Sequence, residues 1–133
     1  MGPRKFDLEE RLLEYAVQII NIVECLPRTR TGNHVAGQLL RSGTSPLPNH
    51  GEAQAAESAS DFIHKLRICL KELRESYRWL RLIHRVPMIK PASRISEILI
   101  ETDELIRIFV ASIRTAEKKR SAAPNNSSLS VGR

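Results

Sequence analysis

The most regular feature of the chain is an amphipathic pattern that runs through four segments. In the first segment, apolar residues recur every three or four positions, as they do on one face of a helix: Leu8, Leu12, Tyr15, Ala16, Ile19, Ile22, Val23 and Leu26. Asp7 is a suitable N-cap residue, and Pro27 ends a helix. The pattern therefore predicts a helix from about residue 8 to residue 26.

The second segment contains prolines. Residues 33–43 are predicted to be helical, with small residues that let a neighbour approach closely: Ala36 and Gly37. Pro46 and Pro48 then remove two amide donors, which kinks or breaks a helix. Ser45 as the cap, with Pro46 at the first position, would restart a helix at once. We therefore expect a kinked or two-piece second helix that resumes to about Glu57.

The third and fourth segments carry the clearest helical seams. Ser58 to Asp61 resembles a capping box. It precedes a seam in which steps of four and three alternate: Phe62, Leu66, Cys69, Leu73, Ser76, Leu80 and Ile83. The fourth segment, from about residue 92 to residue 118, repeats the seam with Ile95, Ile98, Thr102, Leu105, Phe109, Ser112 and Ala116. Such seams are typical of helices that pack in bundles.

These segments predict an all-α protein. Because the connections are short, consecutive helices should be antiparallel. We expect an antiparallel up-and-down four-helix bundle with a proline-kinked second helix. The bundle domain is assigned to residues 1–119 of the 133, and the polar residues 120–133 are expected to form a disordered basic tail.

Composition indicates the cellular location of the protein and the state of its cysteines. No apolar run approaches the ~18 residues of a membrane helix, and acidic residues interrupt the amino terminus where a signal peptide would be apolar. We therefore expect a cytoplasmic protein that does not span a membrane. Cys25 and Cys69 lie at apolar positions without CxxC or Cys/His spacing, so they are predicted to be buried, reduced thiols.

The charge of the chain is unevenly distributed. The net charge is +6, and the pI is near 9.8. Six basic residues of the third segment follow each other at steps of four and three, opposite the seam: Arg67, Lys71, Arg74, Arg78, Arg81 and Arg85. We call these six residues the basic ridge. Acidic residues concentrate in the first and fourth segments.

Three interpretations of the basic ridge are open. Arginines at this spacing suit the phosphates of RNA, with contacts to shape and phosphate rather than to base sequence. The ridge could instead meet acidic helices of a neighbouring subunit. A solvated helix face would pair Glu75 with Lys71 and Arg78.

A polar stripe in and after the second segment also stands out. If the helix continues through its kink, one face carries Arg41, Ser45, Asn49 and Glu52. Glu72 and Glu75 flank the third seam and could meet it. We predict that these six residues form a structural polar network, and the alternative is a ligand site.

The chemistry of an enzyme is missing from the sequence. Asp61-x-x-His64 resembles half of a di-iron motif, but such a site needs a second pair and two further carboxylates. The chain has no phosphate-binding glycine loop, nucleophile elbow or zinc-protease motif. We therefore expect a non-enzymatic protein with no metal and no cofactor.

Four ordered motifs resemble a known family, the four-helix bundle proteins, also called 23S rRNA-intervening sequence proteins. They are Gln38-Leu-Leu-Arg-Ser-Gly-Thr-Ser45, Asn49-x-x-Glu52-Ala53, Asp61-Phe-Ile-x-Lys65-Leu66 and Lys71-Glu72-x-x-Glu75-Ser76-x-x-Trp79-Leu80. The resemblance covers about residues 6 to 118. The chain departs from the family at Pro46, which stands where an aliphatic residue is usual.

The resemblance implies a homo-oligomer, which is a pentamer in known members. Some members are encoded inside intervening sequences of large-subunit ribosomal RNA. A related branch serves as the accessory protein of diversity-generating retroelements and works with a reverse transcriptase and RNA. The leading hypothesis is therefore an oligomeric RNA-associated adaptor that contacts structured RNA or a ribonucleoprotein partner through the basic ridge. The alternative is a structural or protein-interaction subunit.

Overall fold

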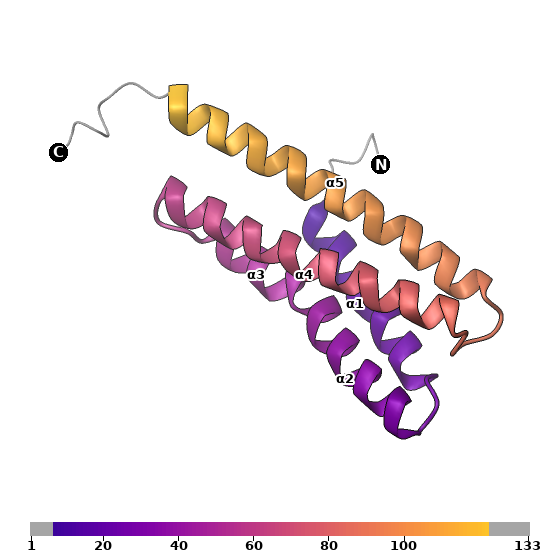
Figure 1. The fold of residues 1–133 in the computed structure, drawn as a ribbon. Coiled ribbons are helices and arrows are strands. Elements are labelled where there is room, and N and C mark those ends of the chain that lie inside the picture. The colour runs from indigo at the N-terminus through magenta and orange to yellow at the C-terminus, as the bar shows by residue number, and fades with distance from the viewer. Residues whose placement is uncertain (1–6, 123–133) are drawn as a thin grey trace, which may run out of the picture.

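The computed structural model describes residues 7–122, and all regular secondary structure in this range is helical. The helices are α1 (Leu8–Glu24), α2 (Arg30–Thr44), α3 (Pro46–Gln54), α4 (Ala59–Arg85) and α5 (Ser93–Ala122) (Figure 1). The predicted all-α class is confirmed. The second predicted helix is present as two pieces, α2 and α3.

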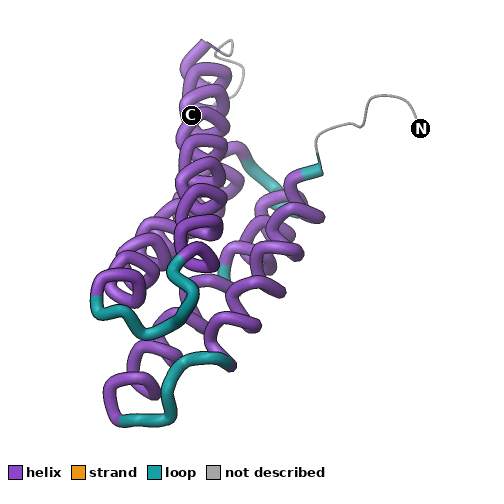
Figure 2. The backbone as a smooth tube through the Cα atoms, turned by 90° about the vertical axis from the view of Figure 1, so that its right-hand side faces the viewer, coloured by secondary structure: helices purple, strands orange, loops and turns teal. Residues whose placement is uncertain are grey.

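The helices form two layers. The loop over residues 86–92 returns the chain, so that α4 and α5 lie side by side and point in opposite directions (Figures 1 and 2). The other layer holds α1 and α2, which pack on each other, and α3, which continues from α2. Both α2 and α3 pack against α4. Helix α4 is therefore the element that joins the layers.

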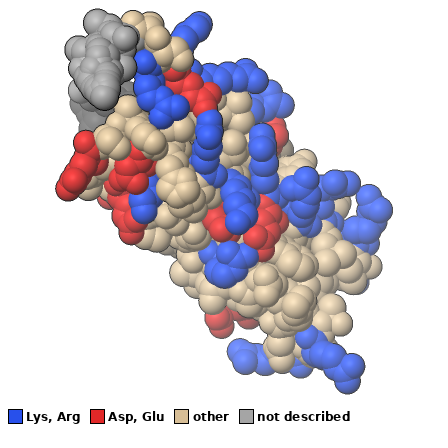
Figure 3. All heavy atoms as spheres, turned by 60° about the vertical axis from the view of Figure 1, so that its left-hand side comes forward, with Lys and Arg blue, Asp and Glu red and all other residues tan. Residues whose placement is uncertain are grey.

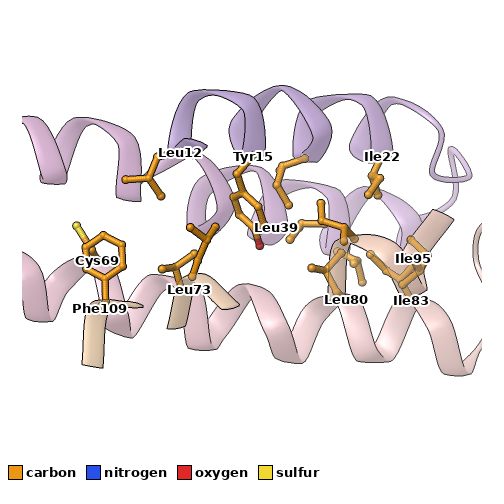
Figure 4. Close-up of a cluster of buried hydrophobic side chains, with 14 of the residues drawn as sticks. Leu12, Tyr15, Ile22, Leu39, Cys69, Leu73, Leu80, Ile83, Ile95 and Phe109 are labelled. Carbon is orange, nitrogen blue, oxygen red and sulfur yellow. The ribbon is translucent and has the colours of Figure 1, made fainter. Parts of the chain in front are cut away.

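The core lies between these layers, along the predicted seams. Figure 4 shows Tyr15 and Leu39 from one layer facing Leu73 and Leu80 of α4. These four side chains are at most 1% exposed. Of the seven seam positions in α4, all but the half-buried Phe62 are fully buried. Burial of such apolar surface stabilises the bundle by about 25 cal/mol per Å².

Side-chain caps set the beginnings of three helices. The predicted caps of α1 and α4 are confirmed: Asp7 Oδ1 accepts a hydrogen bond from the Glu10 amide, and Ser58 Oγ accepts one from the Asp61 amide, each at 3.0 Å. Helix α2 begins earlier than predicted. Thr29 Oγ1 accepts from the Gly32 amide at 3.0 Å, so the helix starts at Arg30 rather than near residue 33.

A single residue, Ser45, separates α2 from α3. Ser45 has helical dihedral angles, φ −61° and ψ −36°, so the backbone passes from one helix into the next. Pro46 restarts the helix as expected, but the Ser45 side chain makes no cap hydrogen bond. Helix α3 ends at Gln54 instead of near Glu57.

The carboxyl-terminal helix is longer than predicted. Helix α5 continues to Ala122, so the first three residues of the expected tail are helical. Lys119 and Arg120 lie in its last turn, where cations interact favourably with the helix dipole. The rest of the expected tail, residues 123–133, lies outside the described residues. None of the helices between residues 7 and 122 has the length and apolar character needed to cross a lipid bilayer.

Two buried hydroxyl pairs cross the core. Tyr15 Oη lies 2.7 Å from Thr102 Oγ1, which itself donates to the Ile98 carbonyl. Ser76 Oγ donates to Ser42 Oγ at 2.8 Å. Burial raises the pKa of Tyr15, so its hydroxyl stays protonated and can donate. These pairs give each buried hydroxyl a hydrogen-bond partner, which it would otherwise lack in the apolar core.

Close helix approach occurs at Gly43, not at the predicted Gly37. A Cβ at Gly43 would lie 2.7 Å from Cγ1 of the fully buried Ile19, whereas one at Gly37 would meet nothing within 4 Å.

We expect Gly43→Ala to lower the free energy of unfolding by about 1 kcal/mol through overpacking, net of its gain in helix propensity. Gly37→Ala, the matched control, should raise it by up to about 1 kcal/mol. Urea unfolding of both variants measures the difference, and equal effects would contradict the close packing.

His50 of α3 makes stability depend on pH. Its ring is 6% exposed, packs edge-on against Phe109, and has no hydrogen-bond partner for Nδ1 among the described residues. Burial lowers the pKa of His50 below 6.5, with a partial offset from Glu9 and Asp7. As pH falls through 6.5, the unfolded chain takes up a proton that the folded chain resists, so stability is lost.

The loss attributable to His50 should reach at most about 1.4 kcal/mol at pH 5.5. Urea unfolding at pH 7.5 and pH 5.5, for the natural chain and for His50→Gln, measures it. The variant should lack this part of the pH dependence. An equal fall in stability for both proteins would show that His50 is not the responsible group.

Candidate nucleic-acid interface

The basic ridge is an exposed face of α4. Leu66, Cys69, Leu73, Leu80 and Ile83 point into the core, which turns the opposite side of the helix outward. All six ridge residues are exposed, as predicted. From Arg67 to Arg85 the ridge is about 27 Å long at ~1.5 Å per residue. Figure 3 shows one face of the molecule on which many basic side chains gather, with some acidic ones among them.

Little of this charge is neutralised within the chain. Among the described residues, the one ion pair of the basic ridge joins Arg67 to Glu117 of α5. Arg78 Nη1 donates to the Arg74 carbonyl at 3.3 Å, which leaves both charges in place. The other ridge residues have cationic groups available for an anion.

Glu75, which would pair with Lys71 and Arg78 if the basic ridge were only a solvated helix face, has other partners. Glu75 Oε2 accepts hydrogen bonds from Arg41 of α2 and from Trp79 Nε1. Arg41 lowers the pKa of Glu75, so this carboxylate stays ionised. The ion pairs of Glu75 with Lys71 and Arg78, which the interpretation as a solvated helix face requires, are absent from the described structure, whereas the contact of Glu75 with Arg41 agrees with the predicted polar network.

Arg41 joins α2 to α4. Its Nη1 lies 2.9 Å from Glu72 Oε1, and its Nη2 contacts Glu75. The Glu72 side chain is only 11% exposed, whereas that of Arg41 is 51% exposed. Arg41 thus reaches over from the surface to neutralise a buried carboxylate.

The remaining members of the predicted polar network form two further groups. Lys65 of α4 bonds Glu52 of α3 at 2.8 Å, at the surface. The Asn49 amide donates to both the carbonyl and the hydroxyl of Ser45, at 3.0 Å each. The six residues therefore make three separate polar groups rather than one buried network. Two of these groups fasten α2 and α3 to α4.

A link between α1 and α5 was missed by the sequence reasoning. Arg11 Nε and Nη2 bond the two oxygens of Glu101 at 2.8 Å, and Nη2 also bonds Glu104 at 2.5 Å. The signal was a single arginine among the acidic residues of α1, with two carboxylates three positions apart on α5. Arg11 of α1 thus neutralises part of the negative charge of α5.

The groups that could support catalysis or metal binding are dispersed. No cluster of three or more His, Cys, Asp or Glu suited to a metal occurs within residues 7–122. Both cysteines are free, but Cys25 is exposed, which corrects the prediction that both are buried. Burial raises the pKa of Cys69 to about 12, so its thiol stays protonated. His64 is exposed.

The fold and its surface define an all-helical domain with a basic helix face. The model of the 23S rRNA-intervening sequence protein family matches residues 4–111, and the chain belongs to this family. A solved structure of a protein of unknown function from the S23 ribosomal protein family of Bacteroides thetaiotaomicron is 34% identical, with a TM-score of 0.74. The match covers 80% of this chain and 98% of that one. No curated protein matches the chain.

Removal of Arg41 should destabilise the joint between α2 and α4. Arg41→Ala leaves Glu72 without its charged partner, and we expect a loss of about 1–3 kcal/mol in the free energy of unfolding. Arg107→Ala is the control, because Arg107 pairs with Asp103 on the exposed side of α5 and should cost about 0.5 kcal/mol or less. Chemical denaturation compares the two variants. Equal small losses would mean that the Arg41 pairs are ordinary surface contacts.

Proposed function

We propose that the protein is a non-enzymatic, oligomeric adaptor that holds structured RNA through the basic ridge. The observation that carries this proposal is the exposure of all six ridge residues with only Arg67 ion-paired in the described structure. A row of cations without internal partners gains most from an external polyanion.

The form of the basic ridge suits phosphates better than base edges. Its residues return about every 5 Å along the helix axis, near the spacing of phosphates along a strand. Arginine forms paired hydrogen bonds with phosphate oxygens. The ridge itself carries no aromatic side chain on which a base could stack. The proposed binding therefore follows backbone shape rather than sequence.

Membership of the family indicates which partners the proposed adaptor would have. Its name associates members with 23S ribosomal RNA, which supports ribosomal RNA or a ribonucleoprotein as the partner. A reverse-transcriptase complex, the partner in the related retroelement branch, is the other setting. We further propose a cytoplasmic homopentamer whose subunit acts as an up-and-down bundle, with α2 and α3 together as the second helix.

A second candidate function is a structural or protein-interaction subunit. The observation that favours it is a set of exposed apolar side chains on α1, Leu13, Val17 and Ile20, which are 43–44% exposed. In this case the basic ridge contacts acidic surfaces of protein, and its affinity for RNA is incidental.

Charge reversal in the basic ridge separates the two functions. The test variant carries Arg67→Glu, Lys71→Glu and Arg74→Glu. The control carries Arg28→Glu, Arg30→Glu and Lys90→Glu, three exposed cations outside the ridge. Both triple changes lower the net charge by six, from +6 to 0, so a general effect of charge is equal in the two proteins.

The test variant should lose at least tenfold in affinity for a structured ribosomal RNA fragment at 150 mM salt, and the control should lose much less. Filter binding measures affinity, circular dichroism measures helicity, and light scattering measures mass. Equal losses in the two variants would refute the role of the ridge in RNA binding. Dissociation of the oligomer in the test variant would favour the structural subunit.

A further inference from the structure

An apolar surface lies on the side of α1 that faces away from the core. Leu13, Val17 and Ile20 follow one another at steps of four and three, which places them on one stripe of the helix. They are 44%, 43% and 43% exposed, whereas Ile19 between them is fully buried. Helix α1 thus has two apolar faces, and only one of them is used by the fold.

Helix α2 extends this surface. Gly43 of α2 packs directly on Ile19 of α1. Leu40 is three residues before Gly43, on the same side of α2, and it is 40% exposed. We call Leu13, Val17, Ile20 and Leu40 the α1 surface. Contiguous exposed apolar residues of this kind mark contact sites in soluble proteins.

Acidic residues accompany the α1 surface. Glu10, Glu14 and Glu24 are exposed on the same helix and take part in no ion pair among the described residues. A partner that covers this surface must therefore offer apolar side chains together with cations.

The carboxyl-terminal end of α4 has that composition. Leu82 and Val86, at the end of the helix, are 42% and 58% exposed. Arg78, Arg81 and Arg85 border a hollow of about 320 Å³ that is also lined by Leu82. We call these five residues the α4 end surface. It belongs to the layer of α4 and α5, whereas the α1 surface belongs to the other layer.

We propose that the α1 surface of one copy of this chain binds the α4 end surface of a second copy. The apolar side chains of α1 meet Leu82 and Val86, and the glutamates of α1 meet the arginines of α4. Pairing of two α1 surfaces would instead bring like charges together, and so would pairing of two α4 end surfaces. The charges therefore select a contact between unlike surfaces.

Such a head-to-tail contact leaves one surface of each kind free, so it continues until a ring closes. The inference rests on the oligomer proposed above and specifies its interface. It also narrows the part of the basic ridge that is open to RNA to Arg67, Lys71 and Arg74, because the other three arginines meet the neighbouring subunit.

A mixing experiment tests the contact. The α1 variant carries Val17→Gln and Ile20→Gln, and the α4 variant carries Leu82→Gln and Val86→Gln. The control is Ile100→Gln, because Ile100 is 63% exposed, more than any other large apolar residue within residues 7–122, and belongs to neither surface. All replaced side chains are exposed, so the fold should be retained, which circular dichroism verifies.

We expect the natural chain and the control to be oligomers by sedimentation at 100 µM, and each double variant to be a monomer of about 15.1 kDa. A mixture of the two double variants should form a one-to-one pair and nothing larger, because each chain keeps one intact and complementary surface. Three outcomes would overturn the proposal: a monomeric natural chain, a double variant that remains oligomeric, or a mixture that stays monomeric.

The outcome of this experiment is independent of RNA binding. RNA affinity is measured on the natural chain and on the Arg67, Lys71 and Arg74 triple variant, and none of these three residues belongs to either surface. A protein that retains RNA but never forms the pair refutes the interface and leaves the RNA role intact. The reverse result refutes the RNA role alone.

Discussion

The structure depends on apolar packing along one seam of α4. This helix meets α2 and α3 on one side and α5 on another, and its seam residues Leu73, Leu80 and Ile83 have no exposed surface. A helix buried on one stripe has its rotation fixed, because any turn about its axis would expose that stripe. The direction of the basic ridge is therefore a consequence of core packing.

Polar contacts then decide how much of that charge remains available. The two carboxylates on the α2 side of α4, Glu72 and Glu75, are occupied by Arg41. The acidic residues Glu101 and Glu104 of α5 are occupied by Arg11. Because cations outside the ridge take these acids, the ridge keeps most of its charge. Ion pairs between helices therefore leave most of the ridge cations without a partner in the described structure.

Elements set by local patterns could be predicted from the sequence, and elements set by tertiary contacts could not. The seams of α4 and α5, the caps at Asp7 and Ser58 and the exposure of the basic ridge follow from spacing along the chain. The first turn of α2 is polar, so periodicity did not reveal it, although Thr29 is a suitable cap. The pair of Arg11 with Glu101 was missed because the two residues, 90 positions apart in the chain, become neighbours only when the fold brings α1 to α5.

The charge of the basic ridge is balanced differently along its length. At the amino-terminal end, Glu117 of α5 compensates Arg67. At the other end, Arg85 lies in the last turn of α4, where the negative end of the helix dipole stabilises cations. Lys71 and Arg74, between these ends, have neither an ion pair in the described structure nor a helix terminus nearby. Repulsion between neighbouring cations is therefore least compensated at the centre of the ridge. A polyanion that binds there relieves the most repulsion and so gains the most electrostatic free energy.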